Sequence, residues 1–195
     1  DSETAHMDLV PLLWNDDIVD GETRTAAIAW LQDEKPLARL LAASWLFFDP
    51  GHSAAAFAVL NELARAPPER IRQLASWQRR RLQIRSRDVT DFNLQRWDAA
   101  VASLEPTLRP GPTFILSRGY VVRQDFEFAA ATFLKVPLIH DSEHPISAES
   151  LLLAGQALTK IGLCKDAARL YVEILDRYAY AAASTQARSA LDQLT

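Results

Sequence analysis

The chain has 195 residues, of which 49% are hydrophobic and 24% are charged, so it can bury a large core and is not disordered throughout. A formal net charge of -4 and a sequence pI near 5.6 disfavour a general binder of nucleic acid or anionic membranes, which is more often basic. Cys164 is the single cysteine, which excludes an internal disulfide and a multi-cysteine metal site.

Residues 1–19 precede the first predicted helix. They lack the basic and apolar regions of a signal peptide, and no stretch of the chain approaches the ~18 apolar residues of a membrane span. The pair His6-Met7 is typical of an expression-vector junction, which would place part of this segment outside the natural chain. The absence of a signal peptide and of a span favours the cytoplasm, although a missing natural N-terminus would change that assignment.

Five amphipathic helices are predicted in the first half of the chain. Asp20 or Thr23 can cap the first, Pro36 suits the first turn of the second, and Pro50-Gly51 ends the second. Their expected ranges are 23–34, 35–48, 53–66, 67–84 and 94–108.

The stretch RPGP at 109–112 is the strongest helix breaker and the predicted joint between residues 20–108 and 109–195, within what we expect to be one continuous stack. Further helices are predicted over 113–124, 126–139, on both sides of Gly162 within 148–175, and over 182–194, where the last is polar enough to cap the stack. No convincing alternating strand pattern occurs, so the predicted fold is all-α, built of stacked antiparallel helical hairpins.

Small residues recur at a regular spacing in these helices. Gly155 precedes Ala167 by twelve residues, and Tyr171 and Ile174 follow that alanine by four and seven. A glycine or alanine on the first helix of a hairpin lets the second helix cross close to it, while the large residues cover the adjacent layer. Gly119, Ala129, Phe133 and Val136 repeat the pattern with a shorter first interval, as do Ala43, Ala56, Leu60 and Leu63 with a longer one.

Residues 148–181 resemble a tetratricopeptide repeat (TPR). The positions that carry this resemblance are Leu151, Gly155, Leu158, Gly162, Ala167, Tyr171 and Ile174, although the usual closing proline is absent near Ala179. Residues 114–137 resemble a second, degenerate copy with a shortened turn between its helices, closed by Pro137.

The N-terminal half resembles HEAT-type helices. The stretch 34–46 has Pro36, Arg39, Ala42, Ala43 and Leu46 at the matching places, and Arg72 and Ala75 echo it. The whole chain also resembles uncharacterised bacterial repeat proteins.

The resemblance implies a concave face, lined by the first helices of the hairpins, that holds a protein or peptide. The function that we expect is therefore a non-enzymatic interaction or scaffold module without a cofactor, with a homo-oligomer as a further option because a stack can end in an open apolar face. The polar residues expected on the binding face are Ser117, Tyr120, Arg123, Glu149, Gln156 and Lys160.

An arginine cluster supports an alternative function in nucleic-acid binding. Arginines crowd residues 70–87, and phosphate groups attract such clusters. The opposing interpretation is that some pair with carboxylates such as Glu69, Asp88 or Asp91, because consecutive helical residues point about 100° apart. The predicted basic patch comprises Arg72, Arg79, Arg80, Arg81 and Arg85.

A less favoured alternative is a metal-dependent enzyme at residues 140–144. His140, Asp141, Glu143 and His144 can all bind zinc, but Pro145 and the turn setting indicate a polar loop. The sequence has no phosphate-binding loop, dinucleotide fingerprint or GxSxG or HExxH motif, so we expect no enzymatic activity.

Overall fold

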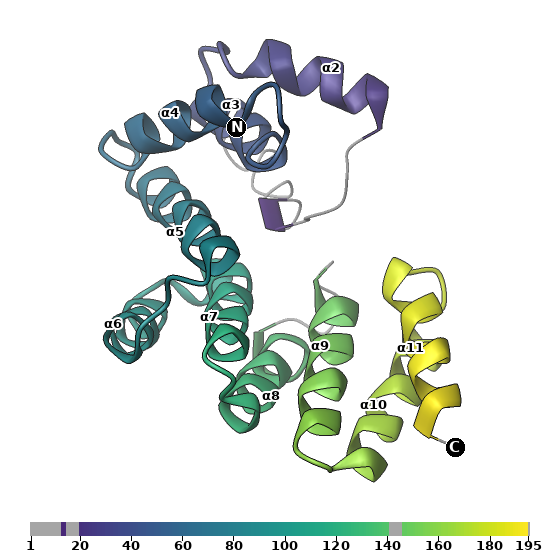
Figure 1. The fold of residues 1–195 in the computed structure, drawn as a ribbon. Coiled ribbons are helices and arrows are strands. Elements are labelled where there is room, and N and C mark those ends of the chain that lie inside the picture. The colour runs from purple at the N-terminus through teal and green to yellow at the C-terminus, as the bar shows by residue number, and fades with distance from the viewer. Residues whose placement is uncertain (1–12, 15–19, 141–145, 195) are drawn as a thin grey trace. The chain divides into compact units, whose positions relative to one another are not determined.

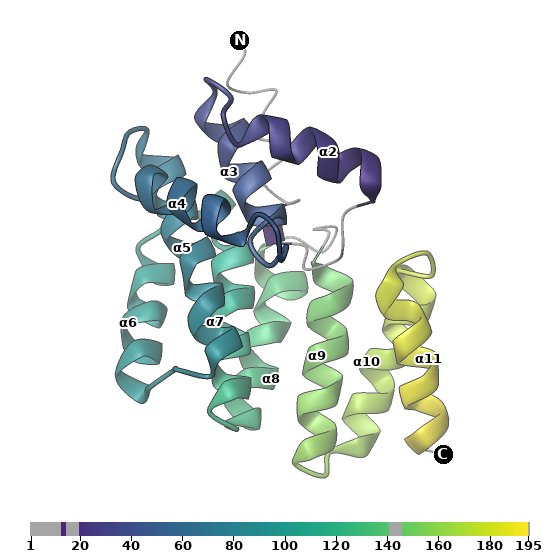
Figure 2. The ribbon, with the colours of Figure 1, turned by 45° about the horizontal axis from the view of Figure 1, so that its top comes forward.

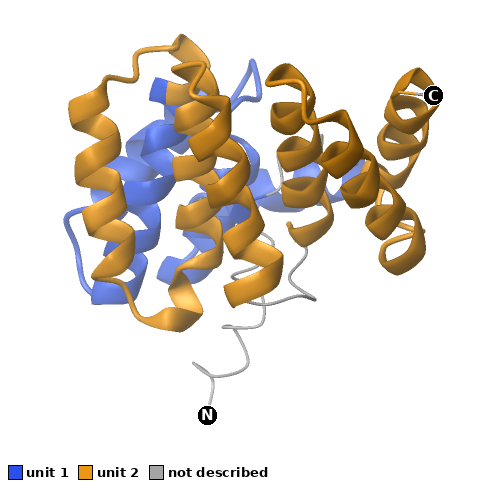
Figure 3. Ribbon diagram, turned by 90° about the horizontal axis from the view of Figure 1, so that it is seen from below, with its two compact units in different colours: residues 1–83 blue, residues 84–195 orange. Residues whose placement is uncertain are grey.

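The computed structural model describes residues 13–14, 20–140 and 146–194. Within these ranges the chain forms ten α-helices and no strand, which confirms the all-α prediction (Figure 1). The chain divides into two compact units, residues 1–83 and 84–195, and the division falls inside α5 (Glu69–Ser86) (Figure 3).

Unit 1 contains α2 (Gly21–Trp30), α3 (Pro36–Trp45) and α4 (Ser53–Leu63), in which α2 packs on α3 and α3 on α4. Asp20 is the cap of α2, because its carboxylate accepts hydrogen bonds from the backbone N–H groups of Glu22 and Thr23 at 3.0 and 2.9 Å. Pro36 occupies the first turn of α3, where its missing N–H leaves no helical bond unmade.

Unit 2 contains α6 (Asp91–Ala102), α7 (Pro110–Val122), α8 (Phe126–Lys135), α9 (Ser147–Lys160), α10 (Cys164–Arg177) and α11 (Ala182–Leu194). Each of these helices packs on the next one in the chain (Figure 2). A short 3₁₀ turn, Pro106–Leu108, precedes α7, and a π-helical turn, Val136–His140, follows α8. The RPGP stretch lies within unit 2, where Pro110 begins α7.

The hairpins α7–α8 and α9–α10 repeat the same local structure 38 positions apart. In each, a residue with positive φ ends the first helix: Gln124 at 61° and Gly162 at 81°. In each hairpin, two backbone hydrogen bonds of a Schellman motif close the turn. The bond that closes the longer ring runs from Asp125 N to Tyr120 O in the first hairpin and from Leu163 N to Leu158 O in the second. The same shift aligns three buried positions: Ala129 with Ala167 and Phe133 with Tyr171 in the second helices, and Val136, directly after α8, with Ile174.

This correspondence corrects the predicted register of the first copy. The turn is not shortened, because three residues separate the two helices in both hairpins. Ser117, not Gly119, therefore occupies the position of Gly155, twelve residues before the buried alanine. Gly119 faces the other way: a Cβ atom there would lie 2.7 Å from Leu94 and 3.1 Å from Trp97, both on α6.

Gly155 permits the close helix crossing that the sequence predicts. A Cβ atom at this position would lie 2.4 Å from the ring of Tyr171, so only glycine lets α10 approach α9 this closely. The buried cluster around Tyr171 continues into α11 through Ala183 and Ala187.

Candidate protein-interaction surface

The predicted binding residues of α9 lie on one side of that helix. Gln156 and Lys160 are exposed and Glu149 is half-buried, and their spacings of seven and four residues bring them to a common face. The repeat places Gly111, Arg118 and Val122 at the equivalent positions of α7.

The predicted residues of α7 do not share this face. Ser117 was expected at the surface, but it is fully buried and its hydroxyl donates a hydrogen bond to the Thr113 carbonyl at 2.8 Å. The prediction had placed Gly119, two residues later, at the inward position that Ser117 occupies. Because two helical residues span about 200°, this error moved Ser117 from the inner to the outer side of the helix. Arg123 is exposed and its Nε donates to Asp91 on α6 at 3.0 Å, while Tyr120 is half-buried.

Tyr120 forms an aromatic pair with Phe128 at the start of α8. The two rings are stacked, with centroids 5.7 Å apart and planes at 25°, and Phe128 is 59% exposed. Burial raises the pKa of the Tyr120 hydroxyl, and the negative charges of Asp98 and Asp125 raise it further. Both carboxylates are exposed, so this corner of unit 2 combines aromatic surface with negative charge.

The hairpin packing does not require this aromatic pair. In the second repeat Leu158 stands at the position of Tyr120 and Asp166 at that of Phe128. Asp166 pairs with Arg169 at the surface, at 3.1 Å, and its hairpin closes with the same turn. Phe128 is therefore an exposed aromatic residue without an evident role in the fold.

The five arginines of the predicted basic patch have different environments. Arg81 was expected to be available to phosphate, but it is only 3% exposed, and its guanidinium donates to the Ser44 carbonyl at 3.0 Å and to Gln78 at 2.8 Å. Arg72 pairs with Glu69, and Arg80 stacks 3.6 Å from the centre of the Trp77 ring. Arg79 is half-buried and Arg85 is exposed.

Of the predicted metal ligands, only His140 belongs to the described residues; Asp141, Glu143 and His144 lie outside them. Nε2 of His140 lies 3.1 Å from the hydroxyl of Thr113 on α7. Burial lowers the pKa of His140, and the positive charges of Arg109 and Lys135 lower it further. Among the described residues no group of three or more His, Cys, Asp or Glu side chains could hold a metal ion.

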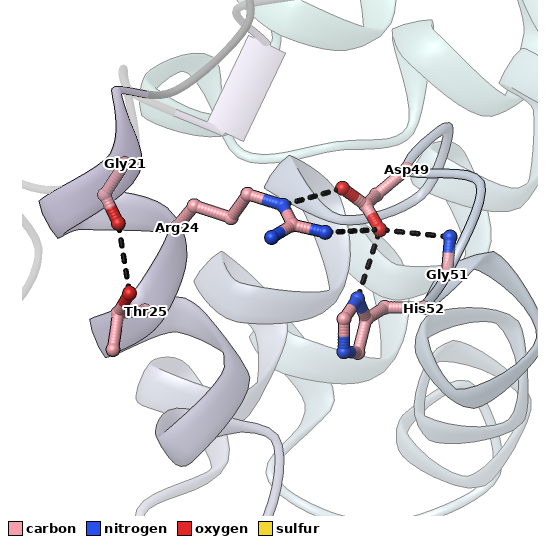
Figure 4. Close-up of polar contacts among 6 residues, drawn as sticks. All are labelled: Gly21, Arg24, Thr25, Asp49, Gly51 and His52. Atoms are coloured by element: carbon pink, nitrogen blue, oxygen red, sulfur yellow. Dashed lines mark hydrogen bonds and ion pairs between the residues drawn. The ribbon is translucent and has the colours of Figure 1, made fainter.

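Unit 1 contains a polar network around one carboxylate, that of Asp49, which the sequence does not predict (Figure 4). Asp49, in the turn after α3, accepts hydrogen bonds from Arg24 Nε at 2.7 Å and Nη2 at 3.2 Å, and from the Gly51 N–H at 3.0 Å. His52 Nδ1 lies 2.8 Å from the same carboxylate. The Arg24 and His52 bonds, with a smaller effect of the Gly51 N–H, hold the pKa of Asp49 well below its usual range. The Asp-Pro-Gly signal indicated the turn, but nothing in the sequence pairs Asp49 with an arginine 25 positions earlier.

Comparison of the chain with protein-family models, curated proteins and solved structures gives no match. None of the described helices is both long and apolar enough to span a membrane.

Proposed function

We propose that this protein is a non-enzymatic interaction module whose TPR-like hairpins in unit 2 bind a protein or peptide. The observation that carries the proposal is the exposed Phe128 ring stacked on Tyr120. Aromatic residues are enriched in protein interfaces, so a stacked aromatic pair that is open to solvent favours a role in contact with a partner.

Two further observations support this function. The two hairpins share one local structure but differ at the positions of Tyr120 and Phe128. The α7–α8 hairpin therefore carries an aromatic surface that the α9–α10 hairpin lacks. Gln156 and Lys160 leave a second, polar face of α9 accessible to solvent.

Site-specific photocrosslinking in cells that produce the protein tests the proposal. A benzophenone amino acid is placed at Phe128, at Lys160, or at the control position Gln186, which is exposed on α11. We expect a discrete protein adduct from position 128 and no such adduct from position 186.

Adducts from position 160 alone would still indicate that the protein binds a partner, but on the polar face of α9. No discrete adduct from 128 or 160, or the same mixture of adducts from all three positions, would contradict the proposal.

A further inference from the structure

We propose that the Tyr120–Phe128 pair receives a cationic side chain, lysine or arginine, from a basic segment of the partner protein. This inference rests on the proposed function, because it specifies the chemistry by which that surface recognises its partner. The surface is defined by Tyr120 on α7, Phe128 on α8 and the carboxylates of Asp98 and Asp125.

The aromatic pair offers the correct kind of surface for a cation. One face of Phe128 stacks on Tyr120, and the side chain is nevertheless 59% exposed, so part of the ring stays open to a partner. The face of an aromatic ring carries negative electrostatic potential and attracts an ammonium or guanidinium group. This chain makes such contacts itself: Arg96 lies over the exposed Phe92 ring at 5.5 Å and Arg177 over Tyr178 at 5.4 Å.

The charges around the pair favour the same ligand. Asp125 caps α8: its carboxylate accepts a hydrogen bond from the Phe128 N–H at 3.5 Å, and its own N–H donates to the Tyr120 carbonyl at 3.0 Å. The charges of Asp125 and of Asp98 on α6 both raise the pKa of the Tyr120 hydroxyl. Arg123, which follows α7, forms an ion pair with Asp91. A basic side chain that reaches the rings would therefore also meet two exposed carboxylates, whereas an acidic segment would be repelled.

A pair of neutral and charged probes separates a cation site from an apolar one. The full chain is titrated with the blocked tripeptide Gly-Arg-Gly and with its citrulline analogue, which has nearly the same shape and no charge. NMR follows the ring protons of Tyr120 and Phe128. We expect saturable shifts with the arginine peptide and at least threefold weaker binding of the citrulline peptide, roughly the ratio that one exposed cation–π contact supplies.

Variants assign the binding to these residues. Phe128→Ala should abolish the saturable shift of Tyr120, and Asp98→Asn with Asp125→Asn should weaken arginine binding severalfold without affecting citrulline. Asparagine caps helices as well as aspartate does, so the start of α8 is preserved. The matched control is Phe92→Ala, since Phe92 is also an exposed phenylalanine, at 65%, and lies outside the proposed surface. This control should bind as the parent chain does.

Equal binding of both peptides, binding that survives Phe128→Ala, or no saturable shift with arginine would each overturn the cation site. Crosslinking at position 128 together with any of these results would leave the proposed function intact. Arginine-specific shifts without a discrete crosslinked protein would contradict the proposed function instead.

Discussion

At the scale of single residues, Arg81 combines charge with nearly complete burial. Its guanidinium donates to the Ser44 carbonyl and to Gln78, and lies 5.1 Å from the Phe48 ring centre. Gln78 in turn donates to the Leu13 carbonyl at 2.8 Å. A buried polar network of this kind is costly to disrupt, because each group that loses its partner stays away from water.

We predict that Arg81→Ala lowers the free energy of unfolding by about 2–4 kcal/mol, through lost hydrogen bonds and lost packing of the side-chain stem. Urea denaturation followed by tryptophan fluorescence measures the change. The matched control is Arg72→Ala on the same helix, where the exposed pair with Glu69 should contribute less than about 1 kcal/mol. Similar small effects of both substitutions would contradict a structural role for Arg81.

The sequence could not assign Arg81 to the interior. Arg79, Arg80 and Arg81 are consecutive, and helical geometry requires that they point in different directions without saying which one points inward. The partners of Arg81 that determine the answer include Ser44, 37 positions away on another helix. For Ser117 the deciding information was also tertiary, because two small residues, Ser117 and Gly119, competed for one place in the pattern.

At the scale of elements, the two Schellman turns permit a matched comparison. Gln124 adopts a left-handed conformation that costs an L-residue with a Cβ roughly 1–2 kcal/mol, whereas glycine adopts it freely. We predict that Gln124→Gly raises the free energy of unfolding by about 1 kcal/mol and that Gly162→Ala lowers it by about 1 kcal/mol. Open space surrounds the Cβ position of Gly162, so strain alone is tested there. Chemical denaturation followed by far-UV circular dichroism gives both values, and the same sign for both changes would contradict this explanation.

The helix crossings give a second comparison between glycines. Alanine at position 155 would collide with the rigid Tyr171 ring, whereas at position 119 the nearest atom is a terminal methyl of Leu94 that can rotate away. We predict that Gly155→Ala destabilises the chain by about 1–3 kcal/mol and more than Gly119→Ala does. Tyr171→Leu removes the ring, so Gly155→Ala should cost less in the Tyr171→Leu chain than in the parent chain. A double-mutant cycle of unfolding free energies measures this difference. Additive costs would argue against the contact.

The elements themselves were more predictable than their contacts. Pro36 at the start of α3 and Gly162 after α9 follow from local capping and breaker rules, which act over a few neighbouring residues. The RPGP stretch shows the limit of such rules. Its prolines predict a break between helices, but proline is also favoured in the first turn of a helix, and α7 begins at Pro110. The sequence does not predict the aromatic pair of Tyr120 and Phe128, because Phe128 has the same spacing as the apolar core residues of its helix and only the structure shows that it is exposed.

At the scale of the whole molecule, the chain divides into units that differ in their spectroscopic probes. Trp14, Trp30, Trp45 and Trp77 belong to unit 1, and Trp97 alone belongs to unit 2. Tryptophan fluorescence therefore reports chiefly on unit 1, whereas far-UV circular dichroism reports on the helices of both. Because of this difference, the effect of a single charge on the stability of unit 1 can be measured by fluorescence in the intact chain.

Asp49 supplies that test, because its carboxylate joins Arg24 at the start of α2 to the turn between α3 and α4. Its pKa is lower in the folded chain than in the unfolded chain, where it is about 3.9, so the carboxylate stabilises unit 1 at neutral pH and loses that effect as the pH falls below about 4. We predict that Asp49→Asn lowers the fluorescence-detected melting temperature at pH 7 and that the difference from the parent chain shrinks on acidification. Asparagine can still accept the Gly51 N–H, so the difference isolates the charge. A difference that stays constant from pH 7 to pH 3 would mean that the ion pair with Arg24 does not stabilise unit 1.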